Sequence, residues 1–215
     1  MAATENLFAE PEFLVDRVEN IDPFRIPDKI KAIASDVDGV LTFYHHWWLN
    51  GQVNSWLNDI HDDGRFIFLV TNSYGKRAIQ LSSIFKDSPI ELIVTPETVS
   101  QPGEKATKHR KPHPDMLDFV LENYQLDPEE LLMLDDQLSA GILAANRANV
   151  PSVLLPRRGR IDHLGVKLIR RGPEAIARAA MGAPFRWRDF PDELTSLEDW
   201  RKQHNGLYTP SNKTA

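Results

Sequence analysis

Short apolar runs alternate with helix-forming segments over most of this chain, and this alternation restricts the folds that it can adopt. Apolar runs bounded by turn residues occur at Ile30–Ala34, Phe66–Val70, Ile90–Val94, Leu131–Leu134 and Ser152–Leu155. Helices are predicted between them over 53–60, Lys76–Phe85, 117–124 and Leu138–Asn149, the first and third from apolar residues spaced i, i+3, i+4, i+7. Such alternation is typical of a mainly parallel sheet covered on both faces. We therefore expect an α/β fold with a three-layer, doubly wound sheet.

Composition and charge restrict the class of protein. The 215 residues are 41% hydrophobic and 26% charged, as expected for one sizeable globular domain. The net charge of -6 does not favour nucleic-acid binding. The absence of cysteine excludes disulfides and thiolate zinc sites, and it fits a cytoplasmic protein. With no long apolar run and no basic leader, we expect neither a transmembrane segment nor a signal peptide.

Three regions are expected along the chain. Residues 1–30 would form a lead-in that packs on the core, and residues 31–182 would form the main domain. Residues 183–215 would be a C-terminal extension, in which Trp187 and Trp200 suggest docking. Its polar end, residues 203–215, is expected to fray.

Polar residues follow the carboxyl ends of the expected strands, which is where ligands bind in open α/β sheets. They are Asp36 and Asp38, then Thr71, Asn72 and Ser73, and then Asp135 and Asp136, while Lys111 stands before the helix predicted over 117–124. Each alone has an ordinary interpretation as a turn, cap or surface residue. Their joint occurrence at one sheet edge indicates a site. A calcium loop is excluded, because Gly39 comes too early and Trp47 stands where a bidentate Glu is needed.

Four stretches resemble, in order, the motifs of the haloacid dehalogenase (HAD) superfamily: DVDGVLT, VTNS, RKPHP and LLMLDDQ. Longer stretches around the first and last resemble its cap-less phosphatases of type IIIA, which include phosphatidylglycerophosphate phosphatases. The resemblance covers about residues 8 to 182. It implies a HAD-like Rossmannoid fold without a large cap domain. It also implies magnesium-dependent hydrolysis of a phosphomonoester through an aspartyl-phosphate.

The resemblance assigns roles to the first motif. Asp36 would be the nucleophile that attacks phosphorus. Asp38 would protonate the leaving alcohol and then activate water. Both can face one phosphoryl group only if the backbone leaves regular strand geometry, and Gly39 supplies that freedom beside the substrate.

The next two motifs would bind the phosphate. Thr71 would donate its hydroxyl to a phosphate oxygen, helped by the backbone amide of Asn72. Lys111 would neutralise phosphate charge and hold Asp36 in place. The neighbouring cations Lys105, Lys108, His109 and Arg110 are interpreted as surface residues, with an anion-attracting rim as the alternative.

The fourth motif would bind magnesium through Asp136, together with Asp36 and the backbone carbonyl of Asp38. Two carboxylates about 4 Å apart repel by roughly 4 kcal/mol at an effective dielectric of about 20, so three beside a phosphate need a divalent cation. Relatives usually carry another acid five residues after the metal-binding Asp, where this chain has Gly141. Either Asp135 replaces that acid or the metal site is weakened.

Two further segments bear on the substrate. Phe43, Tyr44, Trp47 and Trp48 follow the first motif, and either pack on the core, line the site or meet a membrane interface. The segment PRRGRIDHLGVKLIRR, residues 156–171, is either a solvated face or an attachment to an anionic surface. No cap fits between the motifs, so the open site suits a phosphorylated small molecule or a lipid headgroup, with peripheral membrane contact as an option.

Three functions therefore remain open at this point. The first is a magnesium-dependent phosphomonoesterase, with phosphatidylglycerophosphate as a candidate substrate. The second is a catalytically weak HAD-fold protein that binds a phosphoryl ligand, suggested by Gly141. The third is a nucleic-acid phosphatase, which the acidic balance disfavours.

Overall fold

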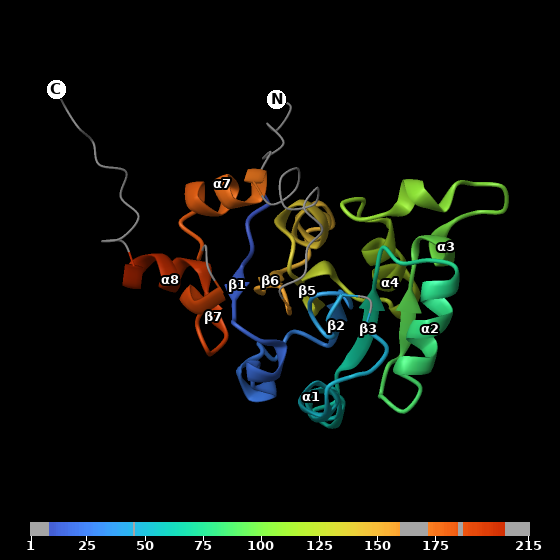
Figure 1. The fold of residues 1–215 in the computed structure, drawn as a ribbon, viewed down its shortest axis with the longest axis horizontal. Helices are drawn as coiled ribbons and strands as arrows, with labels where there is room; N and C mark the ends of the chain where they lie inside the picture. The colour runs from blue at the N-terminus through green and yellow to red at the C-terminus, as the bar shows by residue number, and fades with distance from the viewer. Residues whose placement is uncertain (1–8, 45, 160–171, 185–186, 205–215) are drawn as a thin grey trace.

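One seven-stranded sheet forms the centre of the protein. The structure is a computed structural model that describes residues 9–44, 46–159, 172–184 and 187–204. The strands are β1 (Phe13–Leu14), β2 (Ala32–Ser35), β3 (Phe66–Val70), β4 (Leu92–Val94), β5 (Leu131–Asp135), β6 (Ser152–Leu154) and β7 (Thr195–Ser196). Their order is β4-β3-β2-β5-β6-β1-β7 (Figure 1). All neighbouring strands are parallel except β1 and β7, so the predicted mainly parallel sheet is confirmed.

Helices follow the strands in the predicted alternation. They are α1 (Gly51–Asp62), α2 (Lys76–Ile84), α3 (Pro96–Val99), α4 (Asp115–Tyr124), α5 (Leu143–Arg147), α7 (Gly172–Ala180) and α8 (Leu197–His204). The helix predicted over Leu138–Asn149 differs, because it begins with a π-helical turn, Leu138–Ile142, and α5 follows. In this turn the amide of Ile142 donates to the carbonyl of Gln137, five residues earlier.

The central strands are apolar on both faces, and each face packs on different helices. In β3, Ile67 and Leu69 belong to the cluster that includes α1 and α2, whereas Phe68 and Val70 belong to the cluster that includes α4 and α5. Alternate residues of a strand point to opposite faces, so one short strand contributes side chains to two apolar clusters. The result is the expected three-layer arrangement, with the polar strand ends left at one edge.

The segments on either side of the central domain join the same sheet. β1 pairs with β6, β7 pairs with β1, and the amide of Leu197 donates to the carbonyl of Glu12 at 2.9 Å. Trp200 is buried in a third apolar cluster with residues of α7 and β1. Residues 205–215, most of the end that was predicted to fray, lie outside the described residues. None of the helices that the structure describes has the length and hydrophobicity to cross a membrane.

The N-terminal segment is tied to α1 by the indole of Trp56, which donates to the carbonyl of Ile21 at 2.9 Å and is buried. We expect Trp56→Phe to lower the free energy of unfolding by about 1–3 kcal/mol, because it removes this bond and leaves a void. Trp48→Phe, at an exposed site, is the control and should change it by less than about 0.5 kcal/mol. Urea unfolding followed by circular dichroism measures both, and equal effects would contradict the expectation.

Candidate active site

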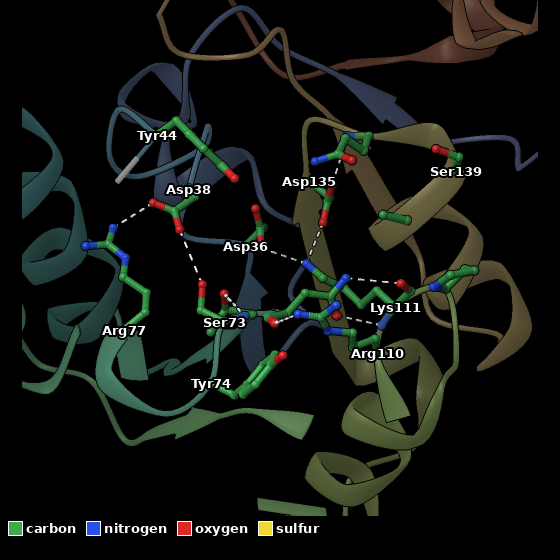
Figure 2. A pocket seen from close by; sticks show the side chains of 15 residues that line it. Asp36, Asp38, Tyr44, Ser73, Tyr74, Arg77, Arg110, Lys111, Asp135 and Ser139 are labelled. Atoms are coloured by element: carbon green, nitrogen blue, oxygen red, sulfur yellow. Dashed lines mark hydrogen bonds and ion pairs between the residues drawn. The ribbon is translucent and has the colours of Figure 1, made fainter. Parts of the chain in front are cut away.

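A pocket of about 720 Å³ opens where β2, β3 and β5 end (Figure 2). The register of β2 and β5 pairs Ser35 with Leu134, so that Asp36 and Asp135 emerge side by side. The amide of Asp36 donates to the carbonyl of Leu134 at 2.9 Å, which continues the ladder by one step. Parallel pairing therefore brings together two acids that are far apart in the sequence.

Lys111 lies between these two acids. Its Nζ is 2.8 Å from Oδ1 of Asp36 and 2.7 Å from Oδ2 of Asp135, and all three side chains are buried (Figure 2). Asn72 fixes the backbone of Lys111 on both sides: its Oδ1 accepts from the Lys111 amide at 2.7 Å and its Nδ2 donates to the Lys111 carbonyl at 3.1 Å. The side chain of Asn72 thus positions the lysine from the end of β3.

Burial and charge set the protonation of this cluster. Burial by itself would lower the pKa of Lys111, but the carboxylates of Asp135 and Asp36 outweigh it and raise that pKa. Burial raises the pKa of Asp36 to about 7, with Lys111 opposing the rise and Asp135 and Asp136 adding to it. Burial also raises the pKa of Asp135. One lysine therefore does not offset the electrostatic cost of these buried acids.

Three carboxylates form a group that can hold a metal ion. Asp36, Asp135 and Asp136 are buried, and one oxygen of each lies within 4.8 Å of the others. An all-oxygen donor set suits a hard divalent cation such as Mg²⁺, and a divalent charge would lower the repulsion between these acids. The residues present therefore fit the metal that the sequence analysis expects, with Asp135 as a member of the group.

Gly141 leaves room for Asp135. A Cβ atom at position 141 would lie 1.9 Å from Oδ2 and 2.2 Å from Cγ of Asp135, closer than non-bonded atoms approach. Oδ1 of Asp135 accepts from the amide of Gln137 at 2.8 Å, which holds the carboxylate in this space. An acid at position 141 and the observed Asp135 exclude each other, so the chain places its carboxylate in the site from Asp135.

Asp38 points to a different part of the pocket from Asp36. Its Oδ1 is 2.7 Å from Nη2 of Arg77, and its Oδ2 accepts from the hydroxyl of Ser73 at 3.4 Å (Figure 2). Thr71 is buried on the pocket wall, where its Oγ1 accepts from the amide of Ser73 at 3.1 Å. The two acids of the first motif thus have separate partners.

Gly39 provides the expected departure from strand geometry. Its φ is 106°, in the left-handed region that favours glycine, and its amide donates to the carbonyl of Thr42 at 2.8 Å. A Cβ here would lie 3.2 Å from the carboxylate of Asp136. Gly39 is not among the residues that line the pocket. The backbone of Gly39, in the first motif, therefore passes close to the carboxylate of Asp136 in the fourth.

Helix α7 holds the loop that carries Asp136. Nη2 of Arg178 donates to the backbone carbonyl of Asp136 at 3.0 Å. Glu174 accepts from both the amide and the hydroxyl of Ser139, at 3.3 and 2.9 Å. A helix from the C-terminal part of the chain therefore stabilises the edge of the site.

The sequence analysis missed Arg77, Glu174 and Arg178. A usable signal existed for Arg77, because it stands four residues before Leu81 and so shares the buried face of α2. Glu174 and Arg178 are likewise four residues apart and share a face of α7. Helical periodicity shows which residues face inward, but it does not show which loop they meet.

Exposed aromatic side chains follow the first motif, and one of them, Tyr44, lines the pocket. Tyr44, Trp47 and Trp48 are 51%, 74% and 55% exposed, so packing on the core, one of the alternatives for this segment, is wrong for these three. Tyr44 and Tyr74 line the pocket.

Arginines accompany these two tyrosines. The guanidinium of Arg110 lies 4.7 Å from the ring centre of Tyr74, and that of Arg157 lies 4.9 Å from that of Tyr44. The rim of the pocket therefore combines aromatic rings with cations.

Some of the basic residues before Lys111 lie on the surface, and one of them lines the pocket. Lys105 and Lys108 are exposed, as predicted, and Arg110 lines the pocket, which fits the alternative of a cationic rim. The ring of His109 contacts the carboxylates of Glu104 and Asp115. His109 thus connects the segment before Lys111 to the start of α4.

The second basic segment is described only over residues 156–159. There Arg158 forms an ion pair with Glu19, and its Nε donates to the carbonyl of Val40 at 3.0 Å. This arginine stabilises the loop after β2. Residues 160–171, which hold most of the cations behind the anionic-surface interpretation, lie outside the described residues.

Comparison with known proteins places the chain in a family. A family model described as haloacid dehalogenase-like hydrolase matches residues 25–155. This range spans more than half of the chain and includes Lys111 and the acids Asp36, Asp38, Asp135 and Asp136. The chain belongs to the haloacid dehalogenase-like hydrolases.

A solved structure with a TM-score above 0.5 shares the fold. A haloacid dehalogenase-like hydrolase from Brucella suis 1330 is 13% identical with a TM-score of 0.51, over 65% of this chain and 88% of that one. NagD from E. coli K-12 is 16% identical with a TM-score of 0.48, over 64% and 91%. A predicted phosphoglycolate phosphatase from Haemophilus somnus 129pt is 15% identical with a TM-score of 0.45, over 67% and 93%.

A sequence match to a human protein is short. Human Bargin is 33% identical over 85 residues, which make up 40% of this chain. They make up 12% of Bargin, so the match spans a small part of that protein.

The space beside Gly141 gives a test of the site's packing. We expect Gly141→Ala to lower the free energy of unfolding by about 1–3 kcal/mol, because the new methyl group displaces the Asp135 carboxylate. Gly51→Ala is the matched control, since its Cβ would have no neighbour within 4 Å and it lies at the start of α1. Chemical denaturation measures both. An unchanged Gly141→Ala variant would contradict the described position of Asp135.

His109 gives the stability a pH dependence. Hydrogen bonds that the ring donates to the carboxylates of Asp115 and Glu104 raise the pKa of His109. The pKa of His109 is therefore higher in the folded protein than in the unfolded chain, where it is about 6.5, so protonation of His109 stabilises the fold below that unfolded value. This stabilisation is lost as the pH rises through the pKa of the folded protein. We therefore expect His109→Gln to cost more unfolding free energy at pH 6 than at pH 9, measured by urea titration. The exposed His61→Gln is the control, and a pH-independent cost at position 109 would contradict the expectation.

Proposed function

We propose that the protein is a magnesium-dependent phosphomonoester hydrolase that works through an aspartyl-phosphate intermediate. The observation that carries this proposal is the position of Asp36, which lines the pocket while Lys111 contacts its Oδ1. A second carboxylate, Asp38, lies two residues further on and lines the same pocket with a separate partner. A nucleophile beside a group that can transfer protons is the arrangement this chemistry needs.

The reaction proceeds in two displacements. A carboxylate oxygen of Asp36 attacks phosphorus, the bond from phosphorus to the leaving oxygen breaks, and that oxygen takes a proton from Asp38. Asp38 then accepts a proton from water, whose oxygen attacks the phosphorus and releases Asp36 and inorganic phosphate. Lys111 and the hydroxyl of Thr71 stabilise the charge on the phosphoryl oxygens.

The acidic group would hold the cation. Asp36, Asp135 and Asp136 are the residues whose carboxylates would bind Mg²⁺, and the carbonyl of Asp38 is the further ligand suggested by the family resemblance. A bound Mg²⁺ would neutralise charge on the phosphate and between the acids. Lys111 contacts both Asp36 and Asp135 and so holds the nucleophile in position.

The surroundings of the pocket favour a phosphate carried on a larger molecule. The link from β2 to α1, residues 36–50, contains no α-helix among its described residues, so no large cap stands there. Exposed Tyr44 and Tyr74, with Arg110 and Arg157, line or flank the entrance. Aromatic rings and cations together suit the region of a lipid headgroup, and phosphatidylglycerophosphate is the first candidate substrate.

Turnover of p-nitrophenyl phosphate and of a panel including phosphatidylglycerophosphate tests the proposal. We expect phosphate release that EDTA abolishes and added Mg²⁺ restores. Asp36→Asn should lower kcat by about three orders of magnitude or more, because an amide is a poor nucleophile. Asp62→Asn, an exposed acid on α1, is the matched control and should retain activity.

Failure of this test has a defined meaning. If the unmutated protein binds Mg²⁺ and phosphate but turns over no ester, the hydrolase proposal is wrong. The same result would favour the phosphoryl-ligand binding protein.

A further inference from the structure

Arg77 is a buried cation at the edge of the pocket, and it contacts one of the two acids of the first motif. It stands in the first turn of α2 and is 9% exposed. Its Nη2 donates to Oδ1 of Asp38 at 2.7 Å, and its Nη1 donates to the carbonyl of His46 at 3.0 Å. Burying a guanidinium is costly unless it is paired, and here the pair is with Asp38.

The position of Arg77 is fixed from two sides. Leu81, one turn later in α2, is buried in the core and anchors the same helix face. The bond to the carbonyl of His46 links Arg77 to the loop that carries Trp47 and Trp48. A guanidinium held in this way presents its nitrogens in a rigid, planar fork.

This contact distinguishes the two oxygens of Asp38. Oδ1 accepts a hydrogen bond from the guanidinium of Arg77 at 2.7 Å, which fixes this side of the carboxyl group. Oδ2 is the oxygen near the hydroxyl of Ser73, a residue that lines the pocket. The pair with Arg77 therefore fixes the orientation of the Asp38 carboxyl group in the pocket, with Oδ2 on the side of Ser73.

We propose that Arg77 is a positioning residue for proton transfer by Asp38 in the hydrolysis reaction. This inference rests on the proposed function, and it adds a residue from α2 to the machinery of the first motif. Arg77 acts through Asp38: it sets the orientation of the carboxyl group that gives a proton to the leaving oxygen as the bond from phosphorus to that oxygen breaks. The same carboxyl group takes the proton of water in the second displacement.

The acidity of the leaving group separates this role from a structural one. An alkyl alcohol is a weak acid, so its ester needs a proton on the leaving oxygen, whereas p-nitrophenolate departs with little help. Misplacing the acid should therefore slow alkyl esters more than the nitrophenyl ester. A general loss of folded protein or of phosphate binding would slow all esters alike.

The experiment compares kcat/KM for p-nitrophenyl, phenyl and n-hexyl phosphate in the full chain with Mg²⁺. For Arg77→Met we expect a loss of about 10- to 100-fold on n-hexyl phosphate, a smaller loss on phenyl phosphate and less than about fivefold on p-nitrophenyl phosphate. Arg77→Lys keeps the charge but not the fork, and should fall between the unmutated protein and Arg77→Met. Lys76→Met removes an exposed cation at the adjacent position and should change none of the three.

A double substitution tests whether Arg77 acts on the reaction through Asp38. Asp38→Asn should show the same order of losses, and adding Arg77→Met to it should lower kcat/KM on n-hexyl phosphate by less than about twofold further. Equal losses of Arg77→Met on all three esters would overturn the inference and assign Arg77 a structural role. If the unmutated protein hydrolyses none of the esters, the proposed function itself fails.

Discussion

The contact of one lysine with two acids is the interaction on which the rest of the site depends. Nζ of Lys111 reaches both Asp36 and Asp135, which end neighbouring strands of the sheet. In the buried pocket these carboxylates repel each other, and the lysine between them offsets part of this repulsion. Asn72 holds the backbone of Lys111, so β3 fixes the cation in turn.

Helices on the two sides of the sheet hold the other acids of the site. Helix α7 stabilises the loop of Asp136 through Arg178, and α2 holds Asp38 through Arg77. Gly141 has the complementary role, since its lack of a side chain leaves space for Asp135. The site is therefore a set of acids with distinct supports, and each support comes from a different element.

Much of the fold could be predicted from the sequence, because hydrophobic periodicity is a local property. The five central strands and helices α1, α2 and α4 fall where the apolar patterns place them. The short strands β1 and β7 were not predicted, since two residues carry no period and their pairing depends on distant segments. The π-helical turn at Leu138–Ile142 was also missed, because the sequence there has an ordinary helical pattern.

The sequence by itself determined which polar residues follow the strands, and parallel pairing then obliges them to meet at one edge. Only the tertiary structure decided how they divide into groups: Asp36 and Asp135 with Lys111, and Asp38 with Arg77. It also decided that Asp135 occupies the space beside Gly141, and that Tyr44, Trp47 and Trp48 face solvent. The physical reason is that the positions of the strands along the chain follow from local patterns, whereas side-chain partners depend on distances between residues far apart in the chain.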